Sequence, residues 1–227
     1  MVQGIPEEWL RENAAIADGF TAMPLEVLVR FGRWQEVLAA PVPPDYLPLA
    51  RCMRLCARGI AYAATGDVEK ARLEQQAFLN AKSALPAEAT FGNNKAHDLL
   101  AVAEMLLQGE IQYRAGEVET AIKALREAVQ REDQLRYAEP PDWIHPVRHA
   151  LGATLLREGR AADAEQVYRE DLTRLPDNGW SLFGLARSLR LQGKNQAAEM
   201  YEAQFQKAWS DADVTLNSSC FCQPGAK

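Results

Sequence analysis

Stretches rich in Ala, Leu, Glu, Gln and Arg follow one another along this chain and are broken at intervals by Gly and Pro. Runs of β-branched residues, which mark strands, are missing, so the pattern predicts an all-α protein. Reading the polar and apolar positions at the helical period of 3.6 residues per turn, we expect helices at these ranges: 5–16, 23–31, 33–40, 45–65, 67–84, 93–115, 117–135, 143–158, 161–174, 178–192 and 195–209.

A motif of small residues recurs four times along these predicted helices. Four glycines are each followed by an alanine five positions later: Gly66, Gly116, Gly159 and Gly193. Another small residue stands seven positions before each of them: Gly59, Gly109, Gly152 and Ala186. The last two units repeat after 34 residues, whereas the earlier spacings are 50 and 43 residues. The motif therefore indicates a helical repeat that carries two insertions.

The third unit shows what each position contributes. Gly152 and Ala164 allow two antiparallel helices to approach closely, and Gly159 permits the turn between them. Tyr168 fills the space that the small residues leave, and Pro176 ends the second helix. The segment HPVRHALGATLLREGRAADAEQVYREDLTRLPDN thus resembles the tetratricopeptide repeat (TPR). The resemblance implies an α-solenoid of antiparallel helix pairs, a TPR-like superhelix with a concave inner wall.

The repeat pattern divides the chain into a TPR-like α-solenoid over residues 1–211 and a C-terminal tail over residues 212–227. Degenerate N-terminal helices take residues 1–44 of the solenoid. Four repeats follow near these ranges: 45–85, 93–135, 145–178 and 179–211. The insertions fall at 83–94 and 137–146, where Pro and Gly interrupt the helical pattern.

In TPR proteins the first helix of each pair lines the concave wall. Helical spacing places these side chains on that wall: Tyr113, Arg114, His149, Arg157, Trp180, Phe183, Arg187 and Arg190. Guanidinium groups suit carboxylates, and aromatic rings are common anchors of binding surfaces. The eight residues therefore predict a groove for a peptide, with acidic groups on the peptide.

Two structural alternatives stay open for these residues. Trp180 and Phe183 also fit the core between repeats, because aromatic side chains at helical spacing are commonly buried. The arginines form an ordinary solvated face if acidic residues on neighbouring helices pair with them. The clamp with which some TPR modules grip chaperone C-termini is not matched, because the equivalent positions hold these residues: Cys56, Ile60, Leu106 and Ala153.

Composition narrows the class of partner and the compartment. The chain has 25 basic and 31 acidic residues, a net charge of −6 and a pI near 5.2, which disfavours nucleic acid as a partner. No apolar run approaches the roughly 18 residues of a membrane span, and the N-terminus lacks the features of a signal peptide. Four cysteines are too few for a disulfide scaffold. We therefore expect a cytoplasmic protein without membrane contact.

Motifs that carry chemistry are missing from the sequence. GxSxG, HExxH, GxGxxG and the phosphate-binding GxxxxGK[ST] do not occur, so we predict no catalytic residue and no cofactor. The expected protein is not an enzyme.

Cysteine and histidine residues supply the alternative function, a metal-binding or metal-dependent protein. Cys52 and Cys56 stand four residues apart, and Cys220 and Cys222 form a CxC pair in the tail. Nothing in the sequence brings the two pairs together, so buried or unpaired thiols are the simpler interpretation. A disulfide within either pair is not expected, because the geometry is strained in a helix.

The preferred hypothesis is a non-enzymatic protein-protein interaction scaffold that binds a partner peptide in the concave groove. Homo-oligomerisation is a further hypothesis, because a truncated first repeat would leave apolar surface for a second copy to cover. The phrases YAEPPDWIHPVRHALG and NGWSLFGLARSL resemble the C-terminal part of bacterial TPR proteins of mostly unassigned function. That resemblance implies a bacterial origin and no reaction.

Overall fold

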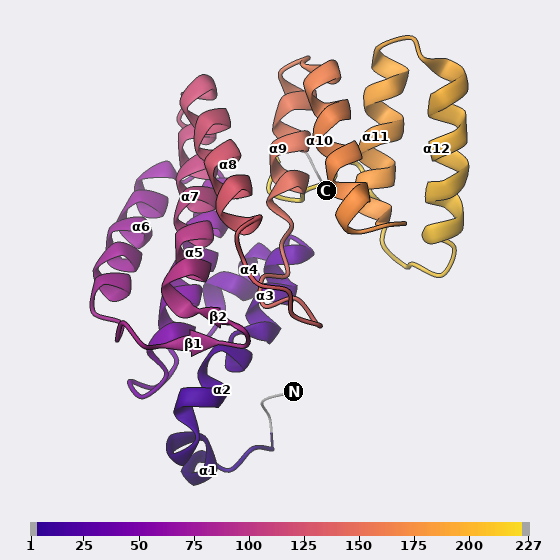
Figure 1. The fold of residues 1–227 in the computed structure, drawn as a ribbon. Helices are drawn as coiled ribbons and strands as arrows, with labels where there is room; N and C mark the ends of the chain where they lie inside the picture. The colour runs from indigo at the N-terminus through magenta and orange to yellow at the C-terminus, as the bar shows by residue number, and fades with distance from the viewer. Residues whose placement is uncertain (1–3, 224–227) are drawn as a thin grey trace. The chain divides into compact units, whose positions relative to one another are not determined.

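The computed structural model describes residues 4–223, which form two compact units that divide between His145 and Pro146. The first unit contains these helices: α1 (Glu7–Glu12), α2 (Ala14–Thr21), α3 (Met23–Arg30), α4 (Trp34–Ala39), α5 (Pro48–Ala64), α6 (Val68–Ser83), α7 (Ala96–Arg114) and α8 (Val118–Glu132). The second unit contains α9 (Val147–Arg157), α10 (Ala161–Arg174), α11 (Gly179–Leu191) and α12 (Asn195–Ala208). Each is drawn in Figure 1. The all-α class is confirmed.

The turns within the helix pairs follow from the repeated glycines. Four of them have φ values between +72° and +91°: Gly66, Gly116, Gly159 and Gly193. This left-handed conformation ends the first helix of each pair and is strained for residues with a side chain. Each pair of the repeat therefore reverses direction where the sequence predicts it.

Small residues in the helices of the first unit bring neighbouring backbones together. Gly59 of α5 lies against Leu107 of α7, and Gly109 of α7 lies against Leu125 of α8. In both places a side chain larger than hydrogen would meet the leucine closer than atoms can approach. The helices of this unit thus pack through leucines seated on glycines.

The N-terminal helices cover α5 and cap its beginning. Asp18 of α2 is buried, and its carboxylate accepts hydrogen bonds from the backbone N–H groups of Leu49 and Ala50 at 2.7 and 2.8 Å. These bonds satisfy two of the N–H groups that the first turn of a helix leaves without partners. Val37 of α4 completes a small core with Ala57 of α5.

Three local features differ from the sequence prediction. The helix expected at 5–16 is divided at Asn13, whose side-chain amide donates to the carbonyl of Trp9 at 2.8 Å and so competes with the helix. A short antiparallel hairpin, β1 (Thr90–Phe91) and β2 (Asn94–Lys95), occupies the first insertion. The helix expected from residue 143 begins only at Val147, because Pro146 disfavours helical geometry in the residue before it.

The second insertion is held by polar contacts within the first unit. The buried carboxylate of Asp142 accepts hydrogen bonds from the Asn93 backbone at 3.0 Å and from the Asn94 side chain at 2.7 Å. Trp143 is buried and donates its indole N–H to the carbonyl of His145 at 2.6 Å. The proline-rich loop is therefore fastened to the β1–β2 hairpin.

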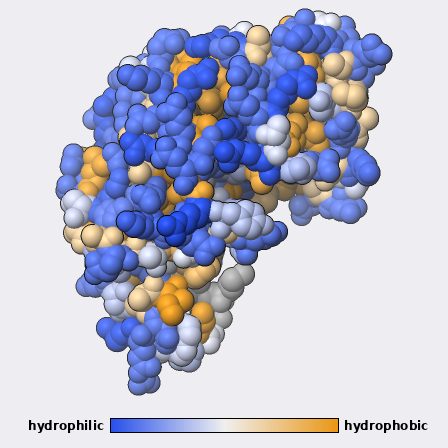
Figure 2. Space-filling view, in the orientation of Figure 1, coloured by the Kyte–Doolittle hydropathy of each residue, from blue (hydrophilic) through white to orange (hydrophobic). Residues whose placement is uncertain are grey.

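Apolar side chains remain exposed on the N-terminal helices. On α2, Ile16 is 74% and Phe20 is 48% exposed, and Figure 2 shows apolar surface where Figure 1 places this helix. The hypothesis that a second copy covers such surface stays a prediction. None of the helices within residues 4–223 has both the length and the apolar character needed to cross a membrane.

The second unit is organised around one tyrosine. Tyr168 of α10 is fully buried, and its ring lies against Gly152 of α9 and Gly184 of α11. Because neither glycine has a side chain, the phenol passes between α9 and α11. Its hydroxyl reaches Ser219 in the C-terminal tail, with 2.6 Å between the two oxygens. The tail therefore lies on the side of α9 and α11 opposite to α10.

Candidate functional site

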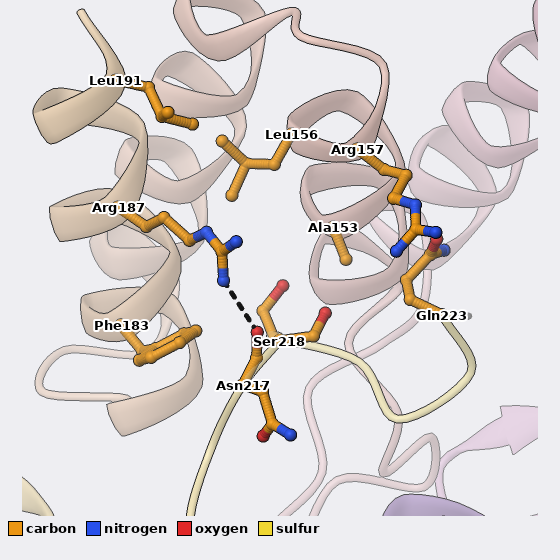
Figure 3. Close-up of a pocket in the computed structure, with 10 residues that line it drawn as sticks. Ala153, Leu156, Arg157, Phe183, Arg187, Leu191, Asn217, Ser218 and Gln223 are labelled. Atoms are coloured by element: carbon orange, nitrogen blue, oxygen red, sulfur yellow. Dashed lines mark hydrogen bonds between the residues drawn. The ribbon is translucent and has the colours of Figure 1, made fainter. Parts of the chain in front are cut away.

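A pocket of about 400 Å³ opens in the second unit, between α9, α11 and the C-terminal tail. These residues line it: Ala153, Leu156, Arg157, Phe183, Arg187, Leu191, Asn217, Ser218, Ser219 and Gln223. Figure 3 shows α11 contributing one wall, α9 the facing wall, and the tail crossing the lower end. The volume lies at the small end of the range for small-molecule sites.

Helical spacing aligns the side chains of the two walls. On α11, Phe183, Arg187 and Leu191 follow at intervals of four residues, so they share one face of the helix. Asn178 caps this helix, and its side-chain oxygen accepts from the backbone N–H of Trp180 at 3.0 Å. On α9, Ala153 and Arg157 are likewise four residues apart. The ordered start of α11 and the tyrosine between the helices fix how the two faces oppose each other.

The pocket is positively charged. Arg157 and Arg187 are exposed, and the lining residues within the described range 4–223 include no Asp or Glu. Arg187 donates a hydrogen bond to the carbonyl oxygen of Asn217 at 2.9 Å, and it has no acidic partner among residues 4–223. In a chain with a net charge of −6, two exposed arginines in one pocket give it a local positive charge, which suits an anion chemically.

Apolar and neutral polar groups complete the lining. Phe183 is half-buried, with its ring 5.5 Å from that of Phe205 on α12 in an edge-to-face arrangement. Gln223 donates its side-chain amide to the Thr154 hydroxyl at 2.8 Å, while its buried Oε1 has no hydrogen-bond partner in the described part of the chain. The pocket thus offers cationic, aromatic and amide contacts together.

Of the eight side chains predicted for the groove, the structure brings three together at this pocket: Arg157, Phe183 and Arg187. Two others are core residues. His149 is 1% exposed, and its Nε2 lies 3.1 Å from Oδ2 of Asp171. Trp180 is 6% exposed and contacts the rings of Trp209 and Phe221 at centroid distances of 5.7 and 5.3 Å. The burial of Trp180 agrees with the core alternative, and its place in the groove stays a prediction.

A buried polar network explains why His149 is retained inside the second unit. Burial opposes ionisation of Asp171, yet the hydrogen bond with His149 holds the pKa of this carboxyl group below its ordinary value. Ser181 of α11 also donates to Asp171, at 2.6 Å. Three helices are thereby joined through one carboxylate.

The remaining predicted residues lie elsewhere. Arg190 pairs with Glu202 of α12 at 2.6 Å, which matches the alternative of a charged face paired with a neighbouring helix. Tyr113 and Arg114 belong to the last turn of α7 in the first unit, where both are half-buried. These three residues do not line the pocket described here.

Sequence reasoning missed the contribution of the tail. Asn217, Ser218, Ser219 and Gln223 line the pocket, although the sequence predicts only an unrepeated tail. The available signal was weak: Leu216 and Phe221 are large apolar residues in a tail without helical periodicity, and apolar residues in a terminal segment favour docking.

The cysteines do not form the predicted kind of thiolate site within either unit. Cys220 and Cys222 are joined by a disulfide, so the expectation of no disulfide is wrong. The helix argument fails because this pair lies in a non-helical tail, where the Cα atoms are 5.2 Å apart. Cys52 and Cys56 are buried in α5, and burial raises the pKa of the Cys52 thiol to about 11. A thiol with a raised pKa is a poor source of the thiolate that metals need.

No protein-family model matches this sequence, and no curated protein matches it. A Podospora anserina putative kinesin light chain with nearly identical TPR-like repeats is similar in structure. It has 16% identity and a TM-score of 0.51, over 92% of this chain and 93% of the other. A MamA protein matches at 13% identity and a TM-score of 0.48, over 88% of this chain and 98% of the other. The predicted TPR-like repeat fold is confirmed.

Proposed function

We propose that this TPR-like helical-repeat protein is a non-enzymatic interaction scaffold that holds an acidic segment of a partner protein against α9 and α11. Arg157 and Arg187 pair with carboxylates of that segment, and Phe183 contacts an apolar side chain beside them. The acidic segment binds at the pocket between α9 and α11. The role is binding, and no residue of the pocket is assigned to a reaction.

The observation that carries this proposal is the charge of the pocket lining. Two arginines stand on facing helices of an acidic protein, and both line one pocket. Arginine presents a planar fork of donors that matches a carboxylate in two parallel hydrogen bonds. A carboxylate ligand would gain charged contacts with both arginines here.

The size and apolar part of the pocket support a peptide side chain as the entering group. A volume of about 400 Å³ has room for one or two side chains. Leu156, Phe183 and Leu191 supply apolar surface beside the arginines, and Figure 3 shows Leu156 and Leu191 extending toward each other from the two helices. A segment that combines Asp or Glu with Leu or Phe fits this combination.

A charge reversal in the pocket tests the proposal. The probes are short fluorescein-labelled peptides in which paired Asp or Glu residues stand beside Leu or Phe, and matched peptides carry Asn and Gln instead. Fluorescence anisotropy measures their dissociation constants. Arg187→Glu should raise the dissociation constants of the acidic peptides at least about tenfold, because the new carboxylate repels the carboxylates of the peptide.

Lys207→Glu is the matched control, because it makes the same charge change on an exposed residue of α12 outside the pocket lining. It should change the dissociation constant less than about threefold. Equal losses in the two variants would contradict a site at the pocket. Equal affinity for the acidic and the amide peptides would contradict an acidic partner.

A further inference from the structure

We infer that the tail segment 216–223 is an intramolecular ligand of the α9–α11 groove, and that a partner segment binds by displacing it. The inference rests on the proposed function, since it describes how the same groove is regulated. The groove in the resting protein is then open only at the pocket, and its remaining length is covered by the protein's own tail.

The tail contacts the side chains and backbone that the repeat pattern assigns to the concave wall. Ser219 donates its hydroxyl to the carbonyl oxygen of His149 at 2.9 Å, and the ring of Phe221 packs edge-to-face on Trp180. His149 and Trp180 are two of the residues predicted for the groove. Both are buried: the imidazole of His149 faces Asp171 of α10, and Phe221 of the tail covers part of the indole of Trp180. The tail therefore occupies the surface that a peptide ligand of this fold is expected to take.

The segment binds without regular secondary structure. No helix or strand is present between residues 209 and 223, and the backbone N–H of Gln223 donates to the carbonyl of Cys220 at 3.3 Å in a turn. Ser219, Phe221 and Gln223 make the contacts with the helices. These contacts reach α9, α10 and α11, but none of them belongs to the helix-to-helix packing of the repeat. Such a segment can leave while the helices stay folded.

The bond to Arg187 is weaker than the one a partner would make. In the resting protein this arginine donates to the neutral carbonyl oxygen of Asn217. A carboxylate in the same place adds a full negative charge and can accept two parallel hydrogen bonds from the guanidinium fork, so it binds this arginine more strongly than a carbonyl oxygen does. An acidic segment therefore has an advantage over the tail at the point where the pocket is already open. Competition begins at Arg187 and proceeds along the tail.

The connection to α12 allows the tail to leave. The chain between α12 and segment 216–223 is exposed at residues 211–213 and at Thr215. The indole N–H of Trp209, just after α12, donates to the carbonyl of Val214 at 2.6 Å and fixes the start of this connection. Asp211 and Asp213 precede Leu216 and Phe221, so the tail carries the same combination of acidic and apolar residues as the proposed partner. A resident segment of the ligand's own chemistry is expected of an autoinhibitory contact.

Weakening the tail in the full-length protein tests the inference. Ser219→Ala removes the hydrogen bonds to Tyr168 and His149, and Phe221→Ala removes the contact with Trp180. Thr215→Ala is the matched control on an exposed tail residue. Two probes are used: the acidic peptide of the proposed function, and a labelled synthetic peptide of residues 211–223 with its disulfide formed. Circular dichroism checks that each variant is folded. If Phe221→Ala does not fold, Ser219→Ala, which is the milder change, carries the test.

Both tail variants should bind both probes at least about tenfold more tightly than the wild type and Thr215→Ala, because the competing segment is weakened. In the wild type, saturation with the acidic peptide should remove the hydrogen-exchange protection of the amides in 216–223. Unchanged or weaker binding in the tail variants would overturn the inference and make the tail a fixed wall of the pocket. Protection that persists in the saturated wild type would do the same. If the acidic peptide binds no form of the protein, the proposed function fails, and the tail peptide still decides whether the groove exchanges its resident segment.

Discussion

At the scale of single residues, one buried carboxyl group of the first unit carries an electrostatic cost. Glu110 of α7 is 1% exposed, and neither of its carboxylate oxygens has a hydrogen-bond partner among residues 4–223. Burial raises the pKa of Glu110 to about 7, and the positive charge of Arg114 offsets only part of this effect. The folded protein therefore binds a proton at pH values where the unfolded chain has released it.

This carboxyl group predicts a loss of stability as the pH rises. The pKa of Glu110 is 4.5 in the unfolded chain and about 7 in the folded one, so the free energy of unfolding falls between these pH values and then levels off. Glu110→Gln should raise the free energy of unfolding at pH 8 by up to about 3 kcal/mol and change it little at pH 4. Urea denaturation at both pH values measures the difference.

Glu88→Gln, which changes an exposed carboxylate of the same unit, is the control and should leave the pH profile as it is. The prediction is contradicted if the free energy of unfolding of the wild type rises from pH 5 to pH 8 and that of Glu110→Gln changes in parallel. The carboxyl group of Glu110 would then not be the source of the pH dependence.

The sequence predicted part of the candidate site and could not predict the rest, for one physical reason. The helical period places Arg157 of α9 and Phe183 and Arg187 of α11 on faces that meet at one pocket. His149 and Trp180 lie on the same helices but are buried. Periodicity tells which side chains share a face of a helix. It does not tell which distant segment covers that face, and here the covering segment is a tail without periodicity.

At the scale of elements, the second unit depends on how closely three helices approach around Tyr168. The side chain of Tyr168 packs against Gly152 and Gly184, and any larger residue at either position overlaps the phenol ring. The sequence predicted this arrangement at Gly152, because the repeat requires a small residue there. It did not predict the role of Gly184, which lies outside the motif, or that the hydroxyl reaches the tail.

Substitution of this second glycine tests the packing. Gly184→Ala should lower the free energy of unfolding by about 1–3 kcal/mol, because the added methyl group overlaps the ring of Tyr168 and outweighs the better helix propensity of alanine. Thermal and urea unfolding followed by circular dichroism measure the loss.

Adding Tyr168→Leu to Gly184→Ala makes room for the methyl group. The double variant should therefore lose less than the two single variants together, which a double-mutant cycle quantifies. Strictly additive losses would place the strain of Gly184→Ala somewhere other than at Tyr168.

At the scale of the whole molecule, the net charge of −6 and the cationic pocket act on an acidic ligand with opposite signs. Charges more than about 10 Å apart are largely screened at 0.1 M salt, so the general repulsion fades first as salt is added. Contacts with Arg157 and Arg187 act at short range and weaken more gradually. The affinity for an acidic segment thus depends on a positively charged pocket in a protein of negative net charge. Composition alone cannot reveal such a pocket.

The two effects separate in a salt titration of the acidic peptides. In the wild type, the dissociation constant should rise several-fold between about 0.05 and 0.5 M NaCl, because ion pairs with the arginines are weakened. In Arg187→Glu the dissociation constant should fall over the same range. This variant mainly repels the acidic peptide, and salt screens that repulsion. Lys207→Glu should follow the wild type, since its charge change lies outside the pocket. Equal slopes in the wild type and Arg187→Glu would mean that the peptide does not meet Arg187, and a salt-independent wild type would mean that its binding is apolar.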